Sequence, residues 1–196
     1  MKRLWLAMLL TLAATPAAAW SGKVVGVTDG DDLKVLRVVD DMKKEVKIRL
    51  YGIDAPEKKQ AFGTQAKKAN SDLAFGKVVE VSEVDTDRYG RTVADVTLPD
   101  KTSLNMRLVY SGMAWWYRKY APKDKTLEKL EAEARKAKRG LWQDPDPTPP
   151  WKWRADQKKK PKPKASQHPE TCRATEKERN APANKSVSCV KTLKNG

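Results

Sequence analysis

Four prolines lie within the seven residues of Asp144–Pro150, and this segment divides the chain. Proline fixes φ and carries no backbone N–H, so such a run interrupts helices and cannot lie inside a sheet. Hydrophobic residues make up 39% of the 196 residues, which is enough for one core of roughly 100–130 residues but not for two. We therefore expect a single folded domain over residues 20–143 and a Pro/Lys-rich linker and tail over residues 144–196.

The tail is strongly basic. Residues 151–196 contain 13 Lys or Arg and 4 Asp or Glu, a net charge of +9 out of +15 for the whole chain. Few aliphatic side chains accompany these charges, so we expect the tail to be disordered or loosely attached. A positive excess favours a polyanionic partner such as DNA or RNA, and anionic lipid or cell-surface polymers fit the charge equally well.

The single histidine and the two cysteines, His168, Cys172 and Cys189, all lie in this tail. A Ser–His–Asp triad, a Cys–His pair within the domain and a Cys/His zinc site are therefore excluded. Chemistry in the domain must depend on carboxylates, arginines, hydroxyls or a cation bound by oxygen. We expect Cys172 and Cys189 to form a disulfide after export, with free or intermolecular thiols as the alternative.

Residues 1–19 have the pattern of a secretory signal peptide. Met1–Arg3 is basic, Leu4–Ala14 is apolar apart from Thr11, and Ala17–Ala19 ends the stretch with small residues. An uncleaved membrane anchor is the alternative, but the apolar run is shorter than the roughly 20 residues that span a bilayer. We expect cleavage after Ala19, a secreted or periplasmic protein, no membrane span in the mature chain, and a monomer.

Strand-like patterns fill the chain between residues 23 and 120. Apolar residues at 46, 48 and 50 alternate with Lys47 and Arg49, which is the period of a half-buried strand. Asp40–Lys43 predicts the turn before that strand, and Gly76 and Gly140 predict the ends of two helices. The pattern predicts an α+β, mainly β fold, with a small, partly open barrel and helices packed beside it. The expected strands are 23–28, 33–39, 45–50, 77–84 and 92–98, and the expected helices are 61–75, 103–110 and 122–139.

Two acidic clusters, Asp29–Asp32 and Asp54–Glu57, fall at neighbouring places in this pattern. With the predicted turn, the residue numbers of each cross-strand pair in the hairpin add up to 83. Asp31 then faces Gly52, and its side chain lies within about 7 Å of that of Asp54. Crowded carboxylates repel unless a cation neutralises them, and calcium accepts carboxylate, carbonyl and water oxygens in flexible number. Asp31, Asp54 and a nearby main-chain carbonyl are therefore a candidate Ca²⁺ site.

Arginines accompany both clusters. Arg49 precedes the second cluster on its strand, and Arg91 begins a later strand. Guanidinium groups stay charged and bind phosphate oxygens in pairs. A cation and two arginines that stabilise charge on phosphorus, with Glu57 to orient or deprotonate a water, are the parts needed for phosphodiester hydrolysis.

Other interpretations fit the same residues. Each acidic cluster taken singly suits a surface turn, and Arg49 suits a solvated strand position. A barrel that binds nucleic acid or another anionic polymer without cleaving it is a second hypothesis. Attachment of the Lys-rich tail to a membrane surface is a third.

Three segments, Val27–Asp31, Ile48–Glu57 and Asp87–Arg91, resemble the motifs of the staphylococcal nuclease (thermonuclease-like) family, and Gly112–Ala114 and Gly140–Trp142 resemble its later landmarks. The resemblance covers roughly residues 22–143. It implies an OB-fold five-stranded barrel with three packed helices. It also implies calcium-dependent cleavage of DNA and RNA that leaves 3′-phosphates, with Arg49, Glu57 and Arg91 at the catalytic positions.

The metal ligands that the resemblance implies are Asp31, Asp54 and the backbone carbonyl of Ala55. Ala55 stands where the staphylococcal enzyme has a threonine, which removes a hydroxyl beside the metal site. Asp32 also replaces a threonine and adds a carboxylate beside Asp31. Such a charge either tightens cation binding or changes which cation is preferred.

The resemblance also implies substrate contacts. Tyr89 matches a tyrosine that contacts the nucleotide, and we expect Arg88 beside it to bind substrate as well. The aromatic segment Trp115–Tyr120 resembles further nucleotide contacts more loosely, and packing in the core is at least as good an interpretation.

Overall fold

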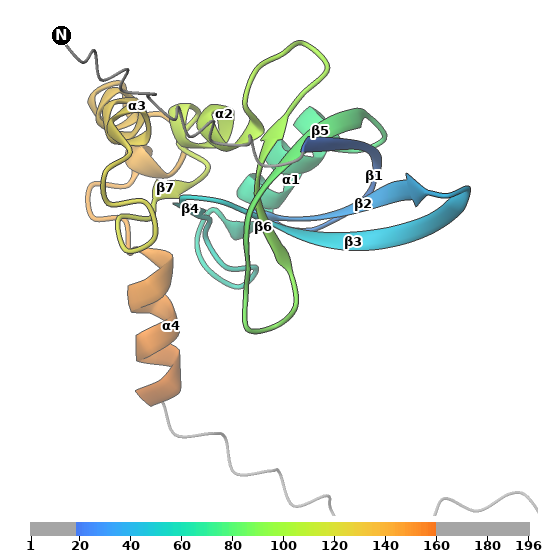
Figure 1. The fold of residues 1–196 in the computed structure, drawn as a ribbon. Coiled ribbons are helices and arrows are strands. Elements are labelled where there is room, and N and C mark those ends of the chain that lie inside the picture. Colours follow the sequence, from blue (N-terminus) through green and yellow to red (C-terminus); the bar gives the residue numbers. More distant parts are fainter. Residues whose placement is uncertain (1–18, 160–196) are drawn as a thin grey trace, which may run out of the picture. The chain divides into compact units, whose positions relative to one another are not determined.

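Five strands close into a barrel in the computed structural model, which describes residues 19–159 (Figure 1). The order around the barrel is β1-β2-β3-β6-β5, and β5 is hydrogen-bonded back to β1. The pair of β3 with β6 is parallel, and the other pairs are antiparallel. The expected mainly β, OB-type fold is confirmed, with a closed barrel in place of a partly open one. The strands are β1 (Ala19–Asp29), β2 (Asp32–Val39), β3 (Met42–Leu50), β5 (Val78–Thr86) and β6 (Thr92–Thr97).

A separate two-stranded ladder joins β4 (Ile53–Asp54) to β7 (Trp115–Trp116). Strands of two residues are too short to show alternation, which is why the sequence pattern did not predict them. Both strands are buried throughout. The ladder fixes Asp54 opposite Trp115, close to the point where the chain leaves β3.

The β2–β3 hairpin turns at residues 40 and 41, both aspartate, which have φ angles of 49° and 61°. Positive φ at both central positions is typical of a type I′ turn. The residue numbers of each cross-strand pair therefore add up to 81, as for Asp32 with Arg49, and the predicted sum of 83 is wrong. A shift of two residues keeps every side chain on its original face. Asp31 consequently faces Leu50 instead of Gly52, and its carbonyl accepts a hydrogen bond from the Leu50 N–H at 2.9 Å.

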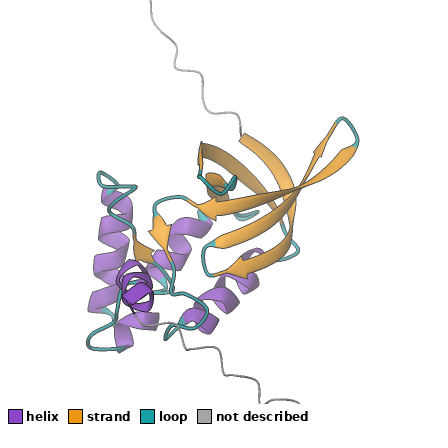
Figure 2. Cartoon of the chain, turned by 90° about the horizontal axis from the view of Figure 1, so that it is seen from below, coloured by secondary structure: helices purple, strands orange, loops and turns teal. Residues whose placement is uncertain are grey.

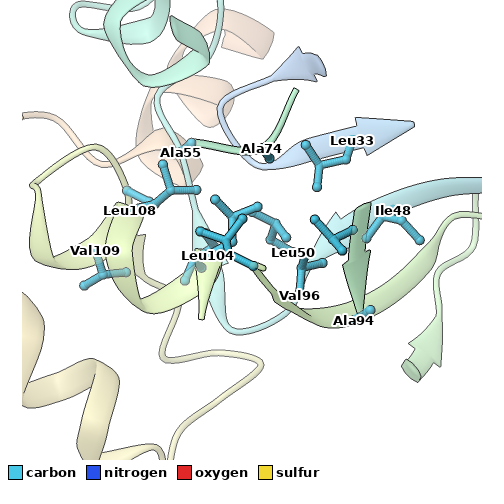
Figure 3. Packing of buried hydrophobic residues seen from close by; sticks show 14 of the residues in the cluster. Leu33, Ile48, Leu50, Ala55, Ala74, Ala94, Val96, Leu104, Leu108 and Val109 are labelled. Carbon is cyan, nitrogen blue, oxygen red and sulfur yellow. The ribbon is translucent and has the colours of Figure 1, made fainter. Parts of the chain in front are cut away.

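One hydrophobic core fills the barrel and continues between the barrel and the helices (Figure 3). Ile48 and Leu50 of β3 point into it and are buried, whereas Arg49 between them points to the other face. Leu104 and Leu108, one turn apart on a helix, enter the same core. Burial of one such side chain contributes roughly 1.5–3 kcal/mol of stability. The buried leucines of the helix and the buried residues of β3 therefore hold the helix against the barrel.

Three helices pack beside the barrel, as the sequence predicted (Figure 2). The second of them contacts the first, the third and strand β6. Ser103 and Asp124 begin the second and third helices, where each side chain accepts a hydrogen bond from the N–H three residues later. The helices are α1 (Gly63–Ala74), α2 (Leu104–Tyr110) and α3 (Lys125–Lys136), and the short 3₁₀ helix η1 (Gly140–Gln143) follows them.

A fourth helix, α4 (Pro150–Lys159), corrects the expectation of a disordered chain after the prolines. Proline is well accepted in the first turn of a helix, so Pro150 starts α4 where composition predicted only a linker. Trp151 packs on Trp115 and stacks on Tyr117, with ring centroids 5.6 and 5.3 Å apart. These aromatic contacts give α4 a tertiary support that composition does not reveal.

Several predictions concern parts of the chain outside the described residues. They are the signal peptide over residues 1–19, of which only Ala19 is described, the part of the expected tail from residue 160 on, and the disulfide between Cys172 and Cys189. Within residues 19–159, no helix is both long enough and apolar enough to cross a bilayer.

Gly112 and Gly140 join the C-terminal ends of α2 and α3 through a backbone contact. Gly112 has a φ of 68°, and a Cβ there would lie 2.1 Å from the carbonyl oxygen of Arg139. We expect Gly112→Ala to lower the free energy of unfolding by about 3 kcal/mol, because it adds a steric conflict to left-handed backbone strain. Gly76→Ala is the matched control: its φ is 77°, but nothing lies within 4 Å of the added Cβ. Its loss is expected to be about 1–2 kcal/mol in urea unfolding, and equal losses would show that the Arg139 contact is unimportant.

Candidate active site

Asp31 lies in the tight turn between β1 and β2, at one end of the barrel. The residue as a whole is 2% exposed, and Oδ2 accepts a hydrogen bond from the Ala55 N–H at 2.7 Å. Asn70 of α1 is fully buried and donates from Nδ2 to the carbonyls of Asp29 and Gly30, at 3.2 and 3.1 Å. The turn is thus fixed from the helix side as well as by the strands. Asp31 therefore has little freedom of position.

Arg49 lies between the two buried carboxylates that the sequence predicted to meet. Nη1 donates to Asp31 Oδ1 and Nη2 donates to Asp54 Oδ1, both at 2.7 Å. The side chains of Asp31, Asp54 and Arg49 are 3%, 0% and 19% exposed. Charge-assisted hydrogen bonds to both carboxylates offset the cost of burying them.

Glu57 follows β4 and faces the same group of charges. The short segment from Ala55 to Glu57 is held by Gln60, which accepts from the Glu57 N–H at 3.1 Å and donates to the Glu57 carbonyl at 2.8 Å. The start of α1 packs directly on this segment, because a Cβ at Gly63 would lie 2.0 Å from the Glu57 carbonyl oxygen. Glu57 is 30% exposed, so its carboxylate remains within reach of solvent.

Arg91 lies next to this group and has its own acidic partners. Nη1 donates to both carboxylate oxygens of Asp32, at 2.8 and 2.7 Å, and Nε donates to Asp87 Oδ2 at 2.7 Å. Asp32 also lies 3.8 Å from Arg49, so it links the two arginines. The carboxylate that replaces the expected threonine therefore orients Arg91 in this structure.

Arg154 of α4 is a site residue that the sequence did not predict. Nη2 donates to Asp54 Oδ2 and Nη1 donates to Glu57 Oε1, both at 2.7 Å, and Nη1 also reaches Asp54 Oδ1 at 3.1 Å. The Lys-rich composition after Pro150 concealed it. A usable signal was present: Pro150 at a helix start, followed by Trp151 and Arg154 three residues apart and hence on one helix face.

We define the Asp54 cluster as Asp31, Arg49, Asp54, Glu57 and Arg154. Burial raises the pKa of Asp31 to about 7, although Arg49 opposes the rise. Burial alone would lower the pKa of Arg49, but Asp31 and Asp54 raise it further above its ordinary value. The bonds from Arg154 to Asp54 and Glu57 likewise raise its pKa against the effect of burial. Both guanidiniums therefore stay fully charged.

The structure brings most of the predicted site residues together. Asp31, Arg49, Asp54 and Glu57 share one network of hydrogen bonds, and the Ala55 backbone touches Asp31. The remaining predicted residues gather beside it: the Arg91 guanidinium lies 5.7 Å from the centre of the Tyr89 ring, and that of Arg88 lies 5.0 Å from it. Tyr89 is 72% exposed.

The aromatic segment Trp115–Tyr120 follows α2 and begins with β7. Trp115 and Trp116 are buried, and the Trp116 indole N–H donates to the Ala121 carbonyl at 2.8 Å. Both therefore serve packing. Tyr117 is stacked beneath Trp151 with ring planes 3° apart, and Tyr120 is exposed.

The Asp54 cluster fits a hard cation by the chemistry of its donors. All its anionic atoms are carboxylate oxygens, and two of the three carboxylates are buried beside a positive group. Within residues 19–159, no three His, Cys, Asp or Glu side chains are arranged as a complete metal site. A cation at Asp31 and Asp54 would need main-chain and water oxygens as well, which calcium accepts readily.

Comparison with known proteins agrees with this architecture. Residues 47–144, half of the chain, match the model of the family described as staphylococcal nuclease homologue. A protein named Protein ParB from Escherichia coli is 43% identical over 149 residues, which cover 71% of this chain and 82% of the relative. A micrococcal nuclease from Shigella flexneri is 40% identical over 149 residues, covering 71% and 83%. An uncharacterized endonuclease from Escherichia coli O157:H7 is 45% identical over 123 residues, covering 63% and 77%. With the barrel, the motifs and these relatives in agreement, the chain belongs to the staphylococcal nuclease family.

Proposed function

We propose that this protein is a nuclease that hydrolyses phosphodiester bonds of DNA and RNA with the help of a hard divalent cation, calcium by preference. The observation that carries the proposal is the network joining Arg49, Glu57 and two buried carboxylates at one end of the barrel. Family membership supports it, and so do relatives named nuclease or endonuclease.

Each candidate catalytic residue has its own role in the proposed reaction. Arg49 and Arg91 carry permanent charge and present paired N–H donors, which suits the non-bridging oxygens of a phosphodiester. Glu57 is ordered by its neighbours yet open to solvent, so it is placed to orient a water and accept its proton. As the water oxygen bonds to phosphorus, the bond to the 5′ oxygen breaks and that oxygen gains a proton. The products are a 3′-phosphate and a 5′-hydroxyl.

Asp31, Asp54 and the carbonyl of Ala55 would hold the cation. A divalent cation there supplies positive charge for the phosphate oxygens as negative charge develops in the transition state. The rigid turn around Asp31 and the ladder around Asp54 fix the two carboxylates before any ligand arrives. Such preorganisation lowers the cost of ordering the site on binding.

A surface groove beside the site suits a long polyanion. Its volume is about 600 Å³, and its lining includes Tyr89, three basic residues and two acidic ones: Arg37, Lys44, Lys47, Glu45 and Glu83. Tyr89 also lies 5.7 Å from the Arg91 guanidinium, so the groove passes close to one candidate catalytic residue. A nucleic-acid strand held at the site would meet a small excess of basic side chains and an aromatic ring in this groove.

Export completes the proposal. A signal peptide ending at Ala19 would deliver a secreted or periplasmic enzyme that acts as a monomer. N-terminal sequencing of the exported protein should begin at Trp20, and its mass in solution should be that of one chain. A different first residue or a stable oligomer would contradict this part.

Cleavage assays test the central proposal. The purified chain from residue 20 should cut plasmid, single-stranded DNA and RNA in the presence of Ca²⁺, and excess chelator should lower the rate by about 100-fold or more. The new ends should lose phosphate from the 3′ position when treated with a phosphatase. Failure to cut any of these substrates with several divalent cations would overturn the proposal. Metal-independent binding without cleavage would favour the non-catalytic barrel instead.

A further inference from the structure

Helix α4 delivers a positive charge to the candidate cation ligands. Arg154 donates to both oxygens of Asp54 and to Glu57, although it comes from a helix beyond the residues that match the family model. The stack of Trp151 on Tyr117 holds α4 at this position. Asp54 is fully buried, so its two oxygens have few other directions from which to receive a cation.

The charges of the Asp54 cluster indicate that Arg154 takes the place of a divalent cation. When all three are ionised, Asp31, Asp54 and Glu57 carry three negative charges, and Arg49 supplies one positive charge. The remainder is −2, which equals the charge that one divalent cation would neutralise. Arg154 supplies only +1, so its guanidinium neutralises the cluster partially and occupies oxygens that a cation would also need.

We propose that Arg154 is a built-in counter-ion that competes with the divalent cation for Asp54, so that α4 sets the cation affinity of the site. The inference rests on the proposed cation-dependent function. Cation binding requires the guanidinium to leave Asp54, and α4 loses its bonds to Asp54 and Glu57 in the same event. Because only the open fraction of molecules binds, the apparent affinity falls in proportion to that fraction.

Calorimetric titration of the full chain with CaCl₂ measures this competition without relying on activity. Arg154→Met keeps the aliphatic stem and removes the charge, and we expect it to bind Ca²⁺ about tenfold more tightly than wild type. Lys152→Met is the matched control. It removes one positive charge from an exposed position of the same helix, and screening should keep its affinity within about twofold of wild type. An Arg154→Met affinity equal to wild type, or weaker, overturns the inference.

Hydrogen exchange gives a second, independent measurement on wild type. Calcium should speed the exchange of backbone amides in residues 153–159, because α4 loses its anchoring bonds when Arg154 is displaced. Slower or unchanged exchange in α4 would overturn the inference even if Arg154→Met failed to fold. Arg154→Lys keeps the charge, but an ammonium group cannot form the bidentate contact of a guanidinium with both oxygens of Asp54. Its Ca²⁺ affinity should lie between those of wild type and Arg154→Met.

Asp54→Asn separates failure of this inference from failure of the proposed function. If calcium supports cleavage and Asp54→Asn abolishes the binding heat, while Arg154→Met leaves the affinity unchanged, only the role of Arg154 is wrong. If neither wild type nor Arg154→Met binds calcium or cuts nucleic acid, both proposals fail. Binding detected in Arg154→Met but too weak to measure in wild type supports the competition directly.

Discussion

Arg49→Met is expected to lower the cleavage rate by about 100-fold or more and the free energy of unfolding by about 3 kcal/mol at pH 8. The rate falls because a permanent positive charge facing the phosphate is lost. The stability falls because Asp31 and Asp54 stay buried after their shared partner is removed. Asp54 keeps Arg154, so the unpaired charge is mainly that of Asp31. Plasmid cleavage and urea unfolding measure the two effects.

The pH dependence separates charge burial from lost packing. Burial raises the pKa of Asp31 to about 7 even with Arg49 present, and removal of Arg49 raises it further. A carboxyl whose pKa is higher in the folded protein than in the unfolded chain is favoured in its protonated form, so acid stabilises the fold. The stability loss of Arg49→Met should therefore shrink between pH 8 and pH 5.

Arg107→Met is the control for the same substitution at an exposed ion pair. Arg107 lies 2.9 Å from Asp100, and their side chains are 43% and 54% exposed. Its loss should stay below about 1 kcal/mol at both pH values. A loss for Arg49→Met that does not change with pH would mean that Arg49 contributes packing and not charge neutralisation.

The barrel could be predicted because its longer strands alternate visibly between apolar and charged residues. Because of this alternation, the error in the predicted hairpin turn did not change which residues were expected to meet at the site. The observed strand pairing differs from the predicted one by two residues. An even shift keeps each side chain on the same face of the sheet, so Asp31 still meets Arg49 and Asp54. The type I′ turn was missed because it relies on two aspartates with positive φ, where glycine or asparagine is the usual signal.

The residues that the sequence did not predict depend on long-range contacts. The strand β4 is two residues long and exists because Asp54 meets Trp115, which is far along the chain. Asn70 holds the Asp31 turn across about 40 residues, and nothing local distinguishes it from a solvated helix residue. Arg154 reaches Asp54 from 100 residues away, within a stretch whose composition is typical of disorder.

Glu57→Gln is expected to lower kcat by about 100-fold or more with KM nearly unchanged. Glutamine is the same size and still offers Oε1 to Arg154, so the Asp54 cluster keeps its shape. It cannot accept a proton from the attacking water, and that is the step assigned to Glu57. The unfolding free energy should change by less than about 1 kcal/mol, because the side chain is 30% exposed. Steady-state cleavage of a short labelled oligonucleotide in Ca²⁺ gives kcat and KM separately.

Glu128→Gln controls for the loss of one carboxylate charge from the protein as a whole. Glu128 is 46% exposed on α3 and pairs with Lys125 at 2.8 Å, and neither residue belongs to the Asp54 cluster. Its kcat should stay within about twofold of wild type, because an exposed charge outside the hydrogen-bond network of the site is screened. If Glu57→Gln also kept kcat within threefold, the water would have to be activated by another group. A rise in KM at constant kcat would instead assign Glu57 to substrate binding, and the division of labour between Glu57 and the two arginines would be wrong.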